Sequence, residues 1–120
     1  MTTEMRKLGA LGEQLATEYL QELGYQILSR NWRGNRVELD IVALFESTLV
    51  FCEVKTRRSV KQGLPIEAVT NQKLQNLRKA ALSWLAAHSV IHSQIRFDVI
   101  GIVAEYHLAP VIDHVKGIEI

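Results

Sequence analysis

The sequence predicts a single domain of the α/β or α+β class, spanning residues 1–120, in which helices flank a mixed central β-sheet. One segment with helical spacing opens the chain, three strand-like segments follow it, and a second helical segment separates them from further strands. This order is typical of a sheet covered by helices. A length of 120 residues with 48% hydrophobic side chains suits one domain with a substantial core.

The first helix is predicted over residues 4–23. Gly24 provides a C-terminal stop, and Gly9 and Gly12 inside the helix indicate a close approach to the sheet or to a ligand. Glu13 is expected to face solvent when its spacing alone is considered. The apolar stripe of this helix consists of Leu8, Leu11, Leu15, Tyr19 and Leu23.

A first strand is predicted over residues 25–31, followed by a polar loop over residues 32–35. Trp32 in this loop has two interpretations. It packs beneath the loop, which is the default for a tryptophan, or it offers a stacking surface for a nucleic-acid base.

The centre of the chain is a predicted hairpin over residues 37–55, with a short polar turn at residues 46–48. Side chains on a strand alternate between two faces. Leu39 and Ile41 are therefore expected to share the apolar face of the first strand. Cys52 falls in the apolar row of the second strand, where a small buried residue is a far more common role than a nucleophile.

Four charged side chains are predicted on the other face of this hairpin. A turn centred on residues 46–47 places Asp40 opposite Glu53 and Glu38 opposite Lys55, at roughly 4.5–5.5 Å. Two carboxylates at that separation repel each other unless a cation lies between them. Their hard oxygen atoms suit Mg²⁺ or Mn²⁺, and the Lys55 ammonium would stabilise developing negative charge. The alternative is an ordinary solvated strand, on which short Glu-x-Lys triplets are common.

Basic residues gather around this acidic centre. Seven of the fourteen lysines and arginines lie between residues 30 and 61, with only four acids among them. A basic collar around an acidic centre is what a metal-dependent enzyme acting on phosphates requires, and a plain solvated face is the alternative. The basic residues expected to contact nucleic acid are Arg33, Arg57, Arg58, Lys61 and Lys73.

A polar loop over residues 56–70 with the look of a mobile segment leads to a second helix over residues 70–88, capped by Thr70. Lys73 falls in the first turn, where phosphate is attracted, although a solvated lysine is the more frequent case. The predicted buried side of this helix consists of Leu74, Leu77, Ala81, Trp84 and Leu85.

Another alternating strand is predicted over residues 91–103, and a short edge strand over residues 107–112. Arg96 and Asp98 share one face of the longer strand. They either pair with each other, or Arg96 supports the acidic centre from a neighbouring strand. None of the four histidines has metal-ligand spacing to another.

Several classes of protein are disfavoured. No apolar run approaches the roughly 18 residues needed to span a membrane, and the N-terminus carries early acids without the apolar core of a secretory signal. The single cysteine cannot form an internal disulfide, so we expect a reducing, cytoplasmic setting. A net charge of +1 is weak evidence for a polyanionic partner.

The motifs of this chain resemble those of the YraN family of bacterial predicted endonucleases, which are distantly similar to archaeal Holliday junction resolvases. The resemblance covers nearly the whole length. It is carried by LGALGEQLATEYLQELGYQIL at residues 8–28, NWR at 31–33, ELDIVA at 38–43, VFCEVKTRRS at 50–59, GLPIEAVTNQK at 63–73 and RFDVIGI at 96–102.

The resemblance implies a restriction-endonuclease-like fold, whose nuclease motif is an Asp followed by Glu-x-Lys, often with an earlier helical Glu. Asp40, Glu53 and Lys55 match the core of that motif, and Glu13 matches the helical acid. One departure is Val37, where the family usually has glycine, and a glycine there would permit a bulge.

The expected function is therefore that of a nuclease, dependent on Mg²⁺ or Mn²⁺, that cuts DNA at branched or otherwise structured sites. Asp40, Glu53 and Glu13 are the expected metal ligands, with Lys55 completing the catalytic set. A homodimer is expected because enzymes of this fold commonly cut two strands as pairs. The alternatives are a non-catalytic nucleic-acid-binding module on the same fold and an adaptor that binds another protein.

Overall fold

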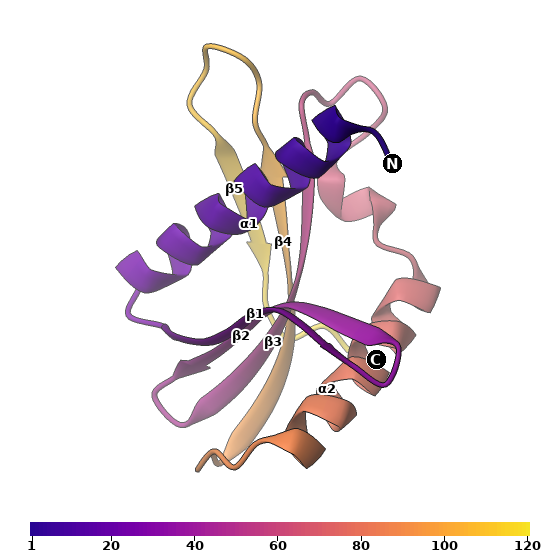
Figure 1. The fold of residues 1–120 in the computed structure, drawn as a ribbon. Helices are drawn as coiled ribbons and strands as arrows, with labels where there is room; N and C mark the ends of the chain where they lie inside the picture. Colours follow the sequence, from indigo (N-terminus) through magenta and orange to yellow (C-terminus); the bar gives the residue numbers. More distant parts are fainter.

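The computed structural model describes all 120 residues. Figure 1 shows two long helices and a twisted sheet. In chain order the elements are α1 (Thr3–Glu22), β1 (Gln26–Gly34), β2 (Val37–Phe45), β3 (Thr48–Arg57), the 3₁₀ helix η1 (Pro65–Ala68), α2 (Asn71–Ala87), β4 (Gln94–Val103) and β5 (Val111–Val115).

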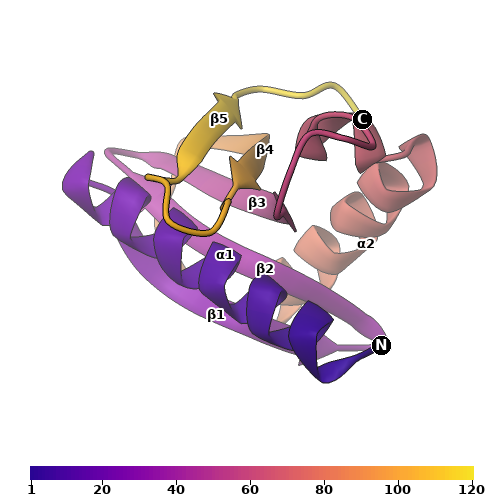
Figure 2. The ribbon, with the colours of Figure 1, turned by 90° about the horizontal axis from the view of Figure 1, so that it is seen from above.

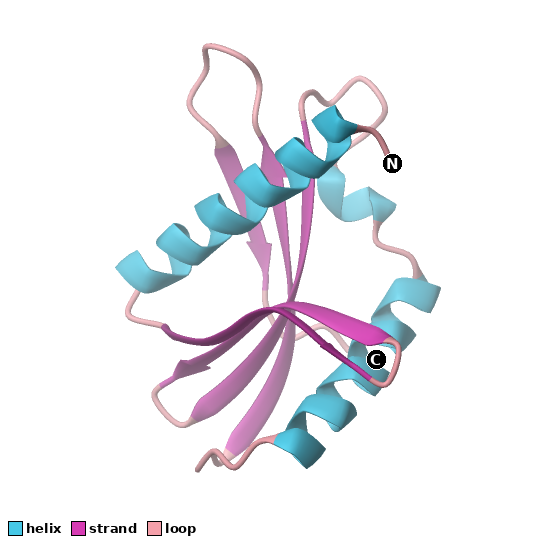
Figure 3. Ribbon diagram, in the orientation of Figure 1, coloured by secondary structure: helices cyan, strands magenta, loops and turns pink.

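The five strands form one sheet in the order β1-β2-β3-β4-β5. Neighbouring strands are antiparallel except β3 and β4, which are parallel because α2 lies in the connection between them. Figure 2 and Figure 3 show α1 and α2 on opposite sides of this sheet. The arrangement confirms the predicted α/β class with a mixed sheet between helices, and it is consistent with the restriction-endonuclease-like fold.

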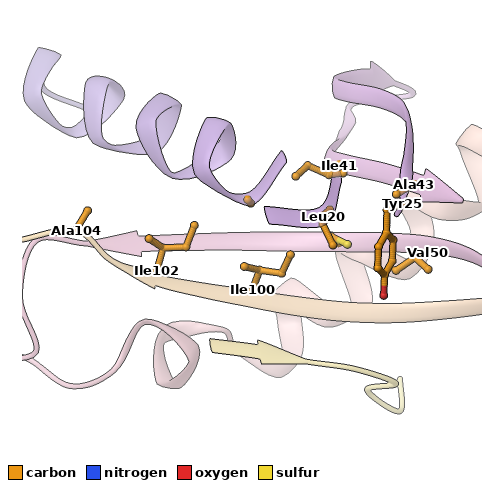
Figure 4. Packing of buried hydrophobic residues seen from close by; sticks show 10 residues of the cluster. Leu20, Tyr25, Ile41, Ala43, Val50, Ile100, Ile102 and Ala104 are labelled. Atoms are coloured by element: carbon orange, nitrogen blue, oxygen red, sulfur yellow. The ribbon is translucent and has the colours of Figure 1, made fainter. Parts of the chain in front are cut away.

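Each face of the sheet carries its own apolar core. The core under α1 is shown in Figure 4 and consists of Ala16, Leu20, Tyr25, Ile41, Ala43, Val50, Cys52, Ile100, Ile102 and Ala104. The core under α2 consists of Leu39, Val42, Leu49, Phe51, Leu77, Ala80, Ala81 and Trp84. Cys52 is fully buried, as its strand position predicted.

The buried side of α1 matches the predicted stripe in part. Leu8, Leu15 and Tyr19 pack partly buried against the core, whereas Leu11 and Leu23 are exposed. The fully buried residues of the helix are Gly12, Ala16, Thr17 and Leu20. The cause is the short distance between helix and sheet: a Cβ atom on Gly12 would lie within 1.7 Å of the Thr56 hydroxyl. Small residues therefore line the contact and set the rotation of the helix. The prediction of close approach holds for Gly12, whereas Gly9 has nothing within 4 Å.

Three strand boundaries were also wrong. β4 begins at Gln94 rather than at residue 91. β1 continues through Trp32 to Gly34, because the left-handed residues Asn35 and Arg36 make a tight turn directly after it. The last strand lies at Val111–Val115 rather than 107–112, because His107 has a positive φ of 64° in the preceding turn.

Aromatic and loop residues take structural roles. Trp32 packs against the core under α2, in agreement with the packing interpretation. The segment predicted as a mobile loop contains η1, whose Pro65 and Ile66 lie on Gly101 of β4, where a Cβ atom would come within 2.8 Å of Ile66. Thr70 caps α2 by accepting a hydrogen bond from the Lys73 amide at 3.2 Å, as predicted.

Alternation on β2 breaks near the acidic residues. Leu39 belongs to the core under α2, whereas Ile41 belongs to the core under α1, so the two do not share a face as predicted. The regular period of two is interrupted at Asp40, between them.

No helix of the structure has the length and apolarity required to cross a bilayer.

A buried polar network ties β4 and β5 together. Asp98 is fully buried, and Arg96 donates two hydrogen bonds to its carboxylate, both at 2.9 Å. The His114 ring bonds to the same carboxylate at 2.7 Å, and the Gly117 amide donates at 3.1 Å. The predicted Arg96–Asp98 pair is thus observed, and Arg96 does not support the acidic centre.

The network reaches the α1 side through two tyrosines. The Tyr25 hydroxyl is 2.7 Å from Arg96, and the Tyr19 hydroxyl of α1 is 2.9 Å from Nδ1 of His114. Burial raises the pKa of Asp98, but the hydrogen bonds from His114, Arg96 and the Gly117 amide outweigh burial and hold that pKa below its ordinary value of 3.8.

Candidate metal centre

The acidic centre forms where β2 and β3 separate. Their paired residues run from Phe45↔Thr48 to Ile41↔Cys52, in the predicted register, and stop there. One residue further, the Asp40 side chain replaces the backbone: its Oδ2 accepts a hydrogen bond from the Val54 amide at 2.8 Å. The hydrogen bond fixes Asp40 beside β3 and leaves Oδ1 for another partner.

Asp40 and Glu53 line the same cavity, which has a volume of about 350 Å³ and lies between the end of the β1–β2 hairpin and α2. Both carboxylates are half-buried. The remaining lining residues are Arg36, Val37, Glu38, Lys73, Asn76 and Leu77. The structure thus brings together two of the predicted metal ligands and one predicted phosphate contact, Lys73.

The two carboxylates are poorly compensated by the chain itself. Burial, followed by the Glu53 carboxylate, raises the pKa of Asp40 from 3.8 to about 8, although the Val54 amide opposes this rise. Burial also raises the pKa of Glu53 above 4.5, and Lys73 and Lys55 only partly offset it. Without an added cation, the pair therefore favours retaining a proton.

Glu13 lies on the α1 side of the same region, whereas Lys55 lies on β3 between Val54 and Thr56, which both face α1. Glu13 and Lys55 line a depression of about 180 Å³, and neither lines the cavity of Asp40 and Glu53. Glu13 is half-buried rather than solvent-facing, and burial raises its pKa. It lies close enough to Asp40 for its charge to raise the pKa of that residue.

Glu38 does not take the position predicted for it. It was expected opposite Lys55, but the strands have separated at this point, and Glu38 pairs with Arg33 of β1 instead. The Arg33 Nε lies 3.2 Å from the Glu38 carboxylate, with both side chains mostly exposed. Arg33 is thus held at the hairpin end, near the cavity but not in its wall.

The remaining basic residues surround a separate depression of about 460 Å³ at the end of β3, together with Lys55. Arg57 donates to the Gln62 carbonyl at 2.8 Å, and Arg58 donates to the Ala104 carbonyl at 3.1 Å. The Arg58 guanidinium also lies 4.1 Å from the centre of the Tyr106 ring. Both arginines hold loops in place while presenting charge, and Lys61 is exposed beside them.

The donor set suits a hard divalent ion only in part. No group of three or more His, Cys, Asp or Glu side chains is placed to hold a metal ion. Two carboxylates facing one cavity are nevertheless the protein share that Mg²⁺ usually takes, since it keeps several waters and binds substrate phosphates. Asp40 and Glu53 fit that pattern, whereas Glu13 lies where it would act through a water or a second ion.

Comparison with known sequences places the chain in a family. The model of the family described as "Uncharacterised protein family UPF0102" matches residues 12–102. The chain belongs to UPF0102, the YraN family. The match covers α1 from Gly12 through most of β4, and thus every residue of the acidic centre.

Curated UPF0102 proteins are similar over nearly their whole length. One from Nocardia farcinica (strain IFM 10152) is 45% identical over 115 residues, covering 96% of this chain and 91% of the relative. Another from Bifidobacterium longum (strain NCC 2705) is 49% identical over 115 residues, covering 93% and 92%. A third, from Acidothermus cellulolyticus (strain ATCC 43068 / DSM 8971 / 11B), is 45% identical over 120 residues, covering 92% and 91%.

In this UPF0102 chain the pairing of β1 with β2 is continuous at Val37. It pairs with Gly34 at the hairpin end and packs against the core under α2. The register shift between β1 and β2 lies far away, between Ile27 and Ser29.

Sequence reasoning missed two residues of the cavity wall, Arg36 and Asn76. The available signal for Asn76 was its spacing of three residues from Lys73, which puts both on one helix face. Arg36 gave no signal beyond its charge, because its position depends on the turn that it forms with Asn35.

Proposed function

We propose that this protein is a metal-dependent nuclease that hydrolyses DNA phosphodiester bonds, with branched or otherwise structured DNA as its substrate. The observation that supports this most is the shared cavity of Asp40 and Glu53. Their raised pKa values show that the chain's own cations do not neutralise the two carboxylates. Buried carboxylates with raised pKa values in a cavity are frequent at functional sites.

Mg²⁺ or Mn²⁺ is the proposed cofactor, held by one oxygen of Asp40 and by Glu53. Such an ion supplies Lewis-acid polarisation of a phosphoryl oxygen and neutralises the charge that develops on the leaving oxygen. The Val54 amide orients Asp40 by its 2.8 Å hydrogen bond, so the carboxylate keeps one direction whether or not substrate is present.

Lys55 serves the centre from β3 and Glu13 serves it from α1. The Lys55 ammonium adds positive charge close enough to lower the pKa of Glu53, and the same charge stabilises an anionic transition state. Glu13 is positioned to accept a proton from a water near Asp40, and burial prepares it by raising its pKa.

The decisive experiment incubates the purified protein with branched, duplex and single-stranded DNA in Mg²⁺ or Mn²⁺. We expect cleavage of branched DNA, and a loss of at least about 100-fold in rate for Asp40→Asn and for Glu53→Gln. Asp40→Asn keeps an acceptor for the Val54 amide, so its fold is preserved. Glu46→Gln is the matched control, because Glu46 is an exposed acid in the turn of the same hairpin.

Two results would end the proposal. One is the absence of cleavage with all three DNA forms. The other is equal cleavage by wild type and Asp40→Asn. DNA binding that is indifferent to EDTA, without cleavage, would identify a non-catalytic binding module instead. Because cutting two strands takes two centres, the proposal includes a homodimer on branched DNA, which light scattering of the complex would detect.

A further inference from the structure

The cavity of Asp40 and Glu53 is lined by hydrogen-bond donors as well as by acids. Lys73 and Asn76 from α2, and Arg36 from the hairpin turn, line it together with the carboxylates. All three are exposed to solvent along part of their length. A cavity of about 350 Å³ lined by acids and by donors has room and polarity for a small anionic group beside a cation.

Lys73 is unpaired although acids line the same cavity. Its ammonium forms no ion pair and no side-chain hydrogen bond in the structure, and the same is true of the Arg36 guanidinium. By contrast, Arg33 pairs with Glu38, and Arg57 and Arg58 bind backbone carbonyls. Lys73 is thus close enough to Glu53 to lower its pKa, yet neither Lys73 nor Arg36 is bound in an ion pair, so both cations are free to contact a ligand in the cavity.

The position of these donors is fixed by contacts away from the cavity. Thr70 caps α2 by accepting a hydrogen bond from the Lys73 amide. Lys73 therefore offers its side chain, not its backbone amide, to a ligand. The side chain of Asn35 donates to the Ser83 hydroxyl of α2 at 3.4 Å, which ties the hairpin turn to the helix. Lys73 and Asn76 then project from one helix face, three residues apart.

We infer that this cavity binds the scissile phosphate, with Lys73, Asn76 and Arg36 contacting its non-bridging oxygens, so that the DNA strand reaches Asp40 and Glu53 from the α2 face. The two lysines of the region then have separate tasks. Lys73 holds the phosphate from α2, and Lys55 acts from β3, two residues beyond Glu53. This inference rests on the proposed nuclease function only in taking the bound phosphate to be the one that is cut. Binding of the phosphate itself is measurable without cleavage.

The test compares Lys73→Ala with Lys79→Ala. Lys79 is an exposed lysine of the same helix, outside the cavity, so both variants lose one charge from α2. Binding of fluorescein-labelled branched DNA is measured by anisotropy in EDTA over a series of salt concentrations. We expect Lys73→Ala to weaken binding about tenfold and to reduce the slope of log K against log salt by about 1. Lys79→Ala should leave the slope unchanged, and Lys73→Arg should restore it.

Cleavage assays on the same variants separate this inference from the nuclease proposal. If wild type cleaves DNA, Lys73→Ala should raise KM more than it lowers kcat. If wild type binds without cleaving, the nuclease proposal fails while the salt slopes still decide the phosphate site. Equal slopes for Lys73→Ala and Lys79→Ala would overturn the inference, as would a wild-type protein that does not bind DNA at low salt.

Discussion

Asp98 on β4 and Asp40 on β2 are carboxylates of the same sheet with opposite surroundings. Asp98 is fully buried and has charged and neutral donors on both oxygens, from Arg96, His114 and the Gly117 amide. Asp40 is less buried, yet a single backbone amide is its only donor and the nearest strong influence on its charge is another acid, Glu53.

The difference shows in the direction of the two pKa shifts. The pKa of Asp98 is lowered and that of Asp40 is raised, although burial pushes both upward. Asp98 therefore completes a network within the chain, whereas the charge of Asp40 is left without a positive partner in the chain. The two carboxylates differ by what surrounds them, not by residue type, and the proposed metal centre would supply the charge that Asp40 lacks.

Removing Asp98 is the largest perturbation that this comparison predicts. Asp98→Ala leaves Arg96 and His114 without their shared acceptor, and we expect a loss of about 3–5 kcal/mol in the free energy of unfolding, measured by urea denaturation. Asp113→Ala on the adjacent strand is the control, because Asp113 is exposed and its loss should change stability by less than about 0.5 kcal/mol. A loss below about 1 kcal/mol for Asp98→Ala would contradict the structural role.

A smaller effect on stability is expected in α1. This helix contributes Glu13 to the region of Asp40, and Tyr19 to the polar network of Asp98 through His114. Gly12→Ala places a Cβ against Thr56 and should cost about 1–3 kcal/mol of stability, because helix and sheet must separate. Gly9→Ala meets no neighbouring atom within 4 Å and should stabilise the protein by about 1 kcal/mol. Thermal unfolding of the two variants tests this, and equal midpoints would refute the close approach.

Adding a divalent ion should stabilise the folded protein only through the Asp40 centre. At a free Mn²⁺ concentration ten times its Kd, one site contributes about 1.4 kcal/mol. Thermal unfolding in Mn²⁺ and in EDTA measures this without any substrate. We expect the gain to disappear in Asp40→Asn and to persist in Glu46→Gln; a gain of the same size in Asp40→Asn would place the ion elsewhere.

A separate predicted effect is a difference in pH dependence. Because the pKa of Asp40 rises from 3.8 to about 8 on folding, the folded metal-free protein holds a proton that the unfolded chain has lost, and stability falls as pH rises through that window. The lowered pKa of Asp98 has the opposite sign, so its contribution is present above pH 3.8 and is lost as pH falls further.

Urea unfolding in EDTA at pH 5 and pH 8 isolates the Asp40 contribution, because Asp40→Asn removes it. We expect Asp40→Asn to gain stability relative to wild type between those pH values. A difference that stays constant with pH would mean that Asp40 is ionised throughout and that the chain already compensates its charge.

Local signals in the sequence were sufficient for the hairpin, the cap of α2 and the order of elements. The turn at Glu46 and Ser47 was predictable because two alternating strands leave only a short polar link. Thr70 was predictable because a cap is a short-range contact. The Arg96–Asp98 pair followed from the period of two along a strand.

Features that depend on contacts between distant segments were not predictable. The buried side of α1 is set by the fit of Gly12 against Thr56, which the leucine spacing cannot show. The hydrogen bond from the Val54 amide to Asp40 lies where the alternation of β2 is interrupted, and Leu39 and Ile41 therefore belong to the cores on opposite faces of the sheet. Asn76 has the sequence pattern of a solvated helix residue, and it lines the cavity only because α2 packs beside the hairpin.

The hydrogen bond from the Val54 amide to Asp40 has a practical consequence. Here a side chain occupies the place of a strand carbonyl, so the shielding of one backbone proton depends on the charge carried by that side chain. The Val54 amide resonance in an NMR spectrum would therefore report whether the proposed centre binds an ion, at a single nucleus in a protein of 120 residues.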